Sequence, residues 1–250
     1  MQGSLLTLKV EGLLGGHSGQ DIDKERQNAD LLMARMIQRL LKETKGQLVS
    51  FNGGTKDNAI PRECEASLIY ESDEEAAKAE ELACELAETY AEELTPAEPD
   101  FSCEISCETN RTAEAIPQDA AKEFICAMRL APNGIQKRNI KMDGFVVVSL
   151  NLGVVRTEED RIVMIFSPRS SVASLQEDTK ERLNTLAETF GFTVSHSSEY
   201  PGWSFKEDSP VREICKESYK ELFGEDLKIE AIHAGLECGL FSDAIKGLDA

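Results

Sequence analysis

The sequence predicts an α+β protein in which a β-α-β-β-α-β set of elements occurs once, is nearly repeated, and is followed by a segment of a different kind. Two patterns predict this. Short segments alternate apolar and polar residues, as strands do, and longer ones place apolar residues every three or four positions, as helices do. With 250 residues, 41% hydrophobic and 29% charged, the chain can form one large domain or two ordinary ones.

The first set occupies residues 5–107. Leu5–Val10 alternates as a strand, a glycine-rich turn follows, and a helix is expected from about Asp23 to Leu41. Three further strands are expected, with a helix between the last two, at Leu48–Asn52, Cys64–Tyr70 and Phe101–Cys107. This order is the split βαβ pattern of ferredoxin-like folds.

The second set has the same order without its first strand. Its elements are expected at Pro117–Leu130 (helix), Phe145–Val155 and Arg161–Ser167 (strands), Ser174–Phe190 (helix) and Thr193–Ser197 (strand). From Tyr200 the pattern changes. Ser209 and Pro210 begin a helix that runs to Phe223. A strand at Leu227–Ala231 and a glycine-containing loop at 233–241 are expected to follow.

The composition excludes some classes of partner. Lys plus Arg is 27 and Asp plus Glu is 46, a net charge of −19, which argues against nucleic acid and anionic membranes. The first residues lack the pattern of a signal peptide, and no apolar run is long enough to span a bilayer. The seven cysteines are expected to be mostly buried thiols in a reducing cytoplasm.

Residues 71–100 carry twelve acidic residues and one lysine. Apolar residues recur there at helical spacing, which leaves the glutamates on the opposite side. This favours a solvated helix face over an acidic docking surface.

The common catalytic motifs are absent, including GxSxG, the Walker loop, GxGxxG after a strand and HExxH. His233 and Glu237 stand four apart, but Gly235 and Gly239 favour a loop over a metal-binding helix face. Cys103 and Cys107 would share one face of a strand, where core packing is the better interpretation than zinc.

Three residues could bind a substrate. His17 lies between glycines where a strand leads to a helix, so it could donate a hydrogen bond to a developing oxyanion, or only cap its turn. Arg169 ends an apolar strand, so it could hold a carboxylate, or form an ordinary salt bridge. Asn58, in a constrained loop, could bind substrate or satisfy its own backbone.

Taken together, several segments resemble the aminoacyl-histidine dipeptidases, which are cytosolic Xaa-His dipeptidases related to carnosinase and the carboxypeptidase G group. The matching segments occur in the family's order and cover nearly the whole chain: Gly15–Ile22, Arg26–Ala29, Asn52–Gly54, Asn58–Arg62, Ser149–Val155, Arg169–Ser171, Tyr200–Trp203 and His233–Phe241.

The resemblance implies a metallopeptidase with two zinc ions, whose catalytic domain is interrupted by a lid domain. It implies that His17 stabilises the oxyanion, that Arg169 holds the dipeptide carboxylate, that Asn58 contacts the substrate, and that Gly235 lies near the substrate's C-terminal end. By the same resemblance the protein is cytoplasmic. A lid fragment could form a homodimer through sheet edges or helices, since unpaired edges favour association. Glu25 occupies a position where many relatives have glycine.

The family's metal ligands, an H-x-D motif, a bridging aspartate, a Glu-Glu pair and later residues, have no counterpart in this sequence. We therefore expect residues 1–198 to be the lid and 199–250 to be an incomplete returning segment of the catalytic domain. Such a chain would bind no zinc and be inactive by itself. The alternative is a non-catalytic α+β module for dimerisation or small-molecule binding.

Overall fold

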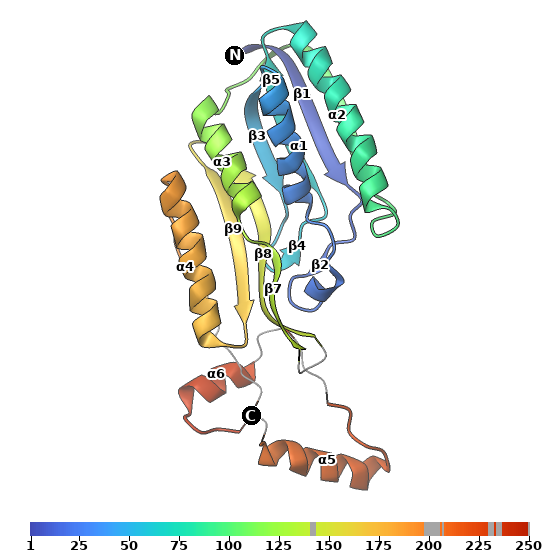
Figure 1. Ribbon diagram of the computed structural model, residues 1–250, viewed down its shortest axis with the longest axis vertical. Coiled ribbons are helices and arrows are strands. Elements are labelled where there is room, and N and C mark those ends of the chain that lie inside the picture. The colour runs from blue at the N-terminus through green and yellow to red at the C-terminus, as the bar shows by residue number, and fades with distance from the viewer. Residues whose placement is uncertain (141–143, 198–205, 207, 230–232, 234–236, 250) are drawn as a thin grey trace.

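The computed structural model describes residues 1–250 except 141–143, 198–205, 207, 230–232, 234–236 and 250 (Figure 1). The first half has the predicted ferredoxin-like order. It contains β1 (Gln2–Glu11), α1 (Ala29–Glu43), β3 (Gln47–Gly53), β5 (Cys64–Tyr70), α2 (Asp73–Leu94) and β6 (Ser102–Thr112). Its strands lie in the antiparallel order β6-β1-β5-β3. Two further elements, β2 (Gly16–His17) and β4 (Ala59–Ile60), form a small separate ladder.

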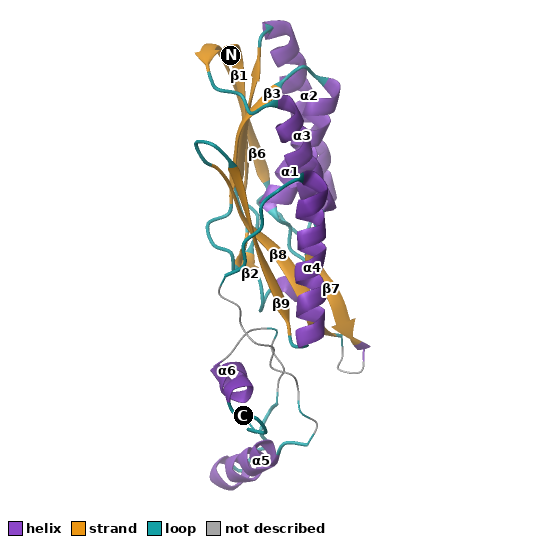
Figure 2. Cartoon of the chain, turned by 90° about the vertical axis from the view of Figure 1, so that its left-hand side faces the viewer, coloured by secondary structure: helices purple, strands orange, loops and turns teal. Residues whose placement is uncertain are grey.

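The second half continues the same sheet. It contains α3 (Gln118–Leu130), β7 (Gly134–Asn139), β8 (Phe145–Thr157), β9 (Ile162–Ser170) and α4 (Ala173–Phe190). The long strand β8 joins the halves, because its far end pairs with β3 through Asn52↔Arg156 and Gly53↔Val155. The result is one seven-stranded sheet with α1 to α4 on one face (Figure 2). The α+β class is confirmed.

The second half departs from the predicted repeat in two ways. Residues 193–197, expected to be a strand, have no regular structure and are exposed, and no strand of the described residues pairs with them. Conversely, β7 was not predicted. Its sequence shows little alternation, and it forms as the antiparallel partner of β8.

Helix α1 begins at Ala29 and not near Asp23. The side chain of Asn28 caps it by accepting hydrogen bonds from the backbone N–H groups of Asp30 and Leu31. Residues Ile22–Lys24 form a separate 3-10 turn that ends at Glu25, whose φ of 51° is left-handed. A left-handed residue after a helical turn is most often glycine, which accounts for the glycine expected at this position in relatives.

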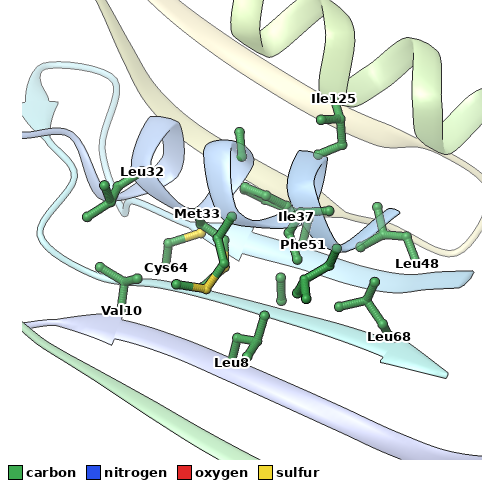
Figure 3. Close-up of a cluster of buried hydrophobic side chains, with 14 of the residues drawn as sticks. Leu8, Val10, Leu32, Met33, Ile37, Leu48, Phe51, Cys64, Leu68 and Ile125 are labelled. Carbon is green, nitrogen blue, oxygen red and sulfur yellow. The ribbon is translucent and has the colours of Figure 1, made fainter. Parts of the chain in front are cut away.

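The core lies between the sheet and the helices (Figure 3). Alternate residues of β1 are buried, and they meet the apolar faces of α1 and α2. Burying a large apolar side chain contributes about 1.5–3 kcal/mol. The core includes Leu6, Leu8, Met33, Ile37, Leu48, Phe51, Leu68 and Tyr90, all fully buried.

Helix α2 confirms the solvated-face interpretation, since its acidic residues are exposed or half-exposed while its buried residues are Ala76, Ala79, Ala83, Tyr90 and Leu94. Cys103 and Cys107 lie on β6 and pack against the core, as predicted. The expectation that the seven cysteines are mostly buried is wrong. All are free thiols, but only Cys64 is fully buried, and Cys84 and Cys215 are exposed.

The C-terminal region contains α5 (Pro210–Phe223) and α6 (Glu237–Ala244). The hydroxyl of Ser209 caps α5 by accepting from the Arg212 N–H at 3.1 Å, as predicted. The strand expected at Leu227–Ala231 is absent from residues 227–229, and 230–231 lie outside the described residues. Gly239 lies in α6 and not in the expected loop. Among the described helices, none is long and apolar enough to cross a membrane.

Candidate functional site

The His17 imidazole is fixed by its own turn. Its Nδ1 accepts hydrogen bonds from the backbone N–H groups of Gly19 and Gln20, at 3.2 and 3.1 Å. A ring nitrogen that accepts two N–H groups carries no proton, so in the neutral ring the proton is on Nε2. Nε2 makes no hydrogen bond to any residue that the structure describes. The ring therefore caps its own turn, and no described residue accepts a hydrogen bond from Nε2.

The backbone around His17 is held from both sides. The His17 N–H donates to the Asp21 carboxylate at 2.8 Å, and the Asp21 N–H donates back to the His17 carbonyl at 2.9 Å. Lys24 bonds the same carboxylate, and these two donors lower the pKa of Asp21, with Lys24 the larger cause. Gly16 has a φ of 143°, and a Cβ there would lie 2.7 Å from the Asp21 carboxylate and the Arg26 guanidinium. Only glycine fits this position.

Asn58 is brought next to His17 by the β2–β4 ladder, in which His17 faces Ala59. The N–H of Ser18 donates to the Asn58 carbonyl at 2.9 Å. The turn is also held from the second half of the sheet. The Asn151 side chain on β8 donates to the carbonyls on either side of Asn58, those of Asp57 at 3.0 Å and Ala59 at 2.8 Å. The Asn58 residue itself is exposed.

Arg169 lies on β9, opposite Ser149 of β8. Its Nε donates to the Ser18 hydroxyl at 3.4 Å, so the residue after His17 contacts both Asn58 and Arg169. Burial lowers the pKa of Arg169, and Asp57 partly opposes that effect. Arg169 forms no ion pair with the described carboxylates, so the ordinary salt bridge considered above is not formed. A half-buried guanidinium that forms no ion pair with a described carboxylate suits an anionic ligand.

His233 joins this group from the C-terminal region. Its Nε2 lies 2.7 Å from the Ser149 hydroxyl, its ring meets Phe145 edge-on, and it is 8% exposed. Burial and the nearby Arg169 lower the pKa of His233 to about 4, so the imidazole is neutral at pH 7. Its carbonyl lies against Gly19, where a Cβ would come within 2.4 Å. His233 therefore contacts two segments that are distant in sequence, strand β8 and the turn after His17.

These side chains line one open cleft, to which His17, Asn58, Arg169 and His233 all contribute. The structure thus brings together three of the four residues that the sequence singled out. Gly235, the fourth, lies outside the described residues. Sequence reasoning missed Asn151, although it lies in the segment Ser149–Val155 that was quoted for the resemblance, and it missed the contact of His233 with Ser149.

A metal centre would need a cluster of strong ligands. Within the described ranges, no group of three or more His, Cys, Asp or Glu side chains is placed to hold a metal ion. His233 is bonded to Ser149, and Cys103 and Cys107 belong to the core. The residues described here therefore do not fit a zinc site.

Comparison with known proteins defines the class. Residues 8–98 match the peptidase dimerisation domain. The α+β fold of the chain matches the fold of that domain.

Two relatives are similar over almost the whole chain. The cytosol non-specific dipeptidase of Escherichia coli is 34% identical over 246 residues, which cover 97% of this chain and 50% of that protein. The crystal structure of aminoacylhistidine dipeptidase from Vibrio alginolyticus matches with a TM-score of 0.86 and 33% identity, covering 96% of this chain and 49% of that one. The resemblance to aminoacyl-histidine dipeptidases is confirmed. The chain spans about half the length of these relatives.

Proposed function

We propose that this chain is the substrate-binding lid of a dipeptidase that hydrolyses Xaa-His-type dipeptides. The observation that carries the proposal is the His17 imidazole. Its Nδ1 is bound to its own turn, its Nε2 makes no hydrogen bond to a described residue, and the residue lines the same cleft as Arg169. A preorganised donor of this kind stabilises an oxygen on which negative charge develops.

In this proposal each residue has a separate task. Arg169 binds the free carboxylate of the dipeptide, because its guanidinium is half-buried and has no described counter-ion. Asn58 contacts the substrate from the turn that Asn151 holds. Gly235 lies near the C-terminal end of the substrate. Residues 1–198 form the lid, and 199–250 form part of the returning catalytic segment.

The remaining chemistry belongs to parts of the parent protein that correspond to the other half of its relatives. There we place two zinc ions and the general base. Since the residues described here do not fit a metal, this chain contributes binding and charge stabilisation and is inactive by itself. The parent is proposed to be cytoplasmic and homodimeric. Its partner is a dipeptide, not nucleic acid or membrane.

The proposal can be tested on this chain by nuclear magnetic resonance. Titration with glycyl-histidine should shift the backbone amide signals of Ser18, Asn58 and Arg169. The same dipeptide with its C-terminus amidated should bind at least about tenfold more weakly, because it lacks the charge that Arg169 pairs with. Arg169→Lys should weaken binding of the free acid similarly. The matched control is Arg161→Lys, an exposed arginine just before β9 that is paired with Glu158.

Equal binding of the acid and the amide, or binding that Arg169→Lys leaves unchanged, would contradict the assignment of Arg169. Shifts confined to α5 and α6 would contradict the location of the site.

A further inference from the structure

The buried carboxylate of the acidic region 71–100 is Glu98. The other acidic residues of this region are exposed or half-exposed, whereas Glu98 is 2% exposed. Its backbone is fixed in the turn after α2, since its N–H donates to the Leu94 carbonyl at 2.9 Å and its carbonyl accepts from Phe101 at 3.2 Å. A carboxylate removed from water needs hydrogen-bond donors, and Glu98 finds them in a distant segment.

Its two oxygens accept from two backbone N–H groups that bracket the His17 loop. Oε2 accepts from Leu14 at 2.7 Å, and Oε1 accepts from Gln27 at 2.9 Å. Leu14 and Gln27 lie outside strands and helices. Between them run residues 15–26, which include β2, His17 and the 3-10 turn. One carboxylate therefore holds both ends of the segment that carries the imidazole.

Hydrogen bonds inside residues 15–26 fix the His17 ring relative to the two ends of this segment. Asp21 fixes the His17 backbone, and the N–H groups of Gly19 and Gln20 fix Nδ1. We propose that Glu98 is a positioning residue that sets the place and the tautomer of the His17 imidazole by clamping residues 14 and 27. The inference rests on the proposed function only in that His17 is the oxyanion donor. Glu98 itself does not touch the cleft.

The first test is hydrogen exchange on the unaltered chain. The amides of Leu14 and Gln27 should exchange far more slowly than unstructured amides, because each is bonded to a buried acceptor. If both exchange as freely as the exposed amides of residues 193–197, the clamp does not exist and the proposal is overturned.

The second test compares Glu98→Gln with Glu92→Gln, an exposed glutamate on α2 that serves as the matched control. A glutamine can accept from one N–H but presents its own amide hydrogens to the other. We expect Glu98→Gln to speed exchange at Leu14 and Gln27 about 10- to 100-fold. It should also bring the two ring nitrogen shifts of His17 closer together, as mixed tautomers do. The unfolding midpoint of the β-sheet signals reports the global fold, and the exposed ring of His196 serves as the control imidazole.

If Glu98→Gln lowers the unfolding midpoint and leaves the His17 nitrogen shifts unchanged, Glu98 has only a structural role. Unchanged His17 nitrogen shifts in a folded Glu98→Gln chain would likewise contradict the proposal. These results are independent of dipeptide binding. A chain with the clamp present and no binding of glycyl-histidine would contradict the proposed function and leave the role of Glu98 in place.

Discussion

The Ser149 hydroxyl on β8 and the His233 imidazole lie 2.7 Å apart in a buried contact that connects the sheet to the C-terminal region. On the sheet, Ser149 is the cross-strand neighbour of Arg169, so the same contact places His233 beside the guanidinium. The cleft lined by His17 and Arg169 and the attachment of the C-terminal region therefore share His233.

Ser149→Ala should weaken this attachment. It leaves the His233 nitrogen buried without its partner, which costs about 1–3 kcal/mol. Hydrogen exchange should increase in α6 while β1 and β5 stay protected. Ser106→Ala, an exposed serine of β6, is the control and should change neither. Equal protection of α6 in both variants would show that the Ser149 contact does not hold the C-terminal region.

Acid should release His233. Its pKa in the folded chain is about 4, below the 6.5 of a free imidazole, so the unfolded or detached form binds the proton more tightly. The stabilisation is complete above about pH 6.5 and is lost as the pH falls toward 4, by at most about 1.4 kcal/mol per pH unit. A titration of the three histidine rings by nuclear magnetic resonance measures this. A His233 ring that titrates near 6.5 would show that it is not buried.

Asp30 should give the opposite pH dependence. This carboxyl is fully buried under Gly53, and burial raises its pKa to about 7 although Cys64 opposes the shift. The contribution of Asp30 to stability should be greatest below about pH 4 and fall as the pH rises to about 7, by at most about 1.4 kcal/mol per unit. Denaturant unfolding at several pH values checks this. Asp30→Asn should reduce the change of the unfolding free energy with pH. Asp119 is exposed in the first turn of α3, so Asp119→Asn should leave that pH dependence unchanged.

Asn28→Ala should destabilise the junction between the two halves. The side chain caps α1 and also donates to the Leu152 carbonyl on β8 at 2.8 Å. Losing the cap and leaving that carbonyl without its partner should lower the free energy of unfolding by roughly 2–3 kcal/mol. Ser72→Ala, which removes the exposed cap of α2 with its longer 3.4 Å bond, should cost at most about 1 kcal/mol. Urea unfolding measures both changes. If the two variants lose the same free energy of unfolding, the bridging role of Asn28 is contradicted.

Glu25→Gly should stabilise the chain. Relief of the left-handed φ of 51° is worth roughly 1 kcal/mol, and the exposed ion pair with Arg138 that is lost contributes a few tenths. Glu25→Ala loses the same ion pair and keeps the strain, so it should give no gain. Thermal unfolding of the three chains decides this, and a gain from alanine equal to that from glycine would show that the backbone is not strained.

The first half of the fold could be predicted because its patterns are local. The alternation in Leu5–Val10 and the helical spacing in α2 each specify an element without reference to its neighbours. Residues 193–197 were also expected to form a strand, but a strand needs a partner edge, which a single segment does not reveal. The start of α1 was missed because the cap at Asn28 lies inside an otherwise helical pattern.

The site was predictable as a set of residues but not as an arrangement. His17, Asn58 and Arg169 could be named from their motifs, yet each alone had an ordinary interpretation. Their proximity arises from the β2–β4 ladder and from strand β8, which the sequence does not pair. Glu98 could not be distinguished from the eleven other acidic residues around it, because nothing local indicates that its carboxylate turns inward.

The central claim is that this chain holds substrate-binding groups without the metal centre. Zinc calorimetry on the purified chain, followed by a dipeptide hydrolysis assay on the same sample, tests it most directly. We expect no tight stoichiometric zinc binding and no turnover. One or two tightly bound zinc ions together with hydrolysis would contradict the account, because the chain would then contain a complete active site.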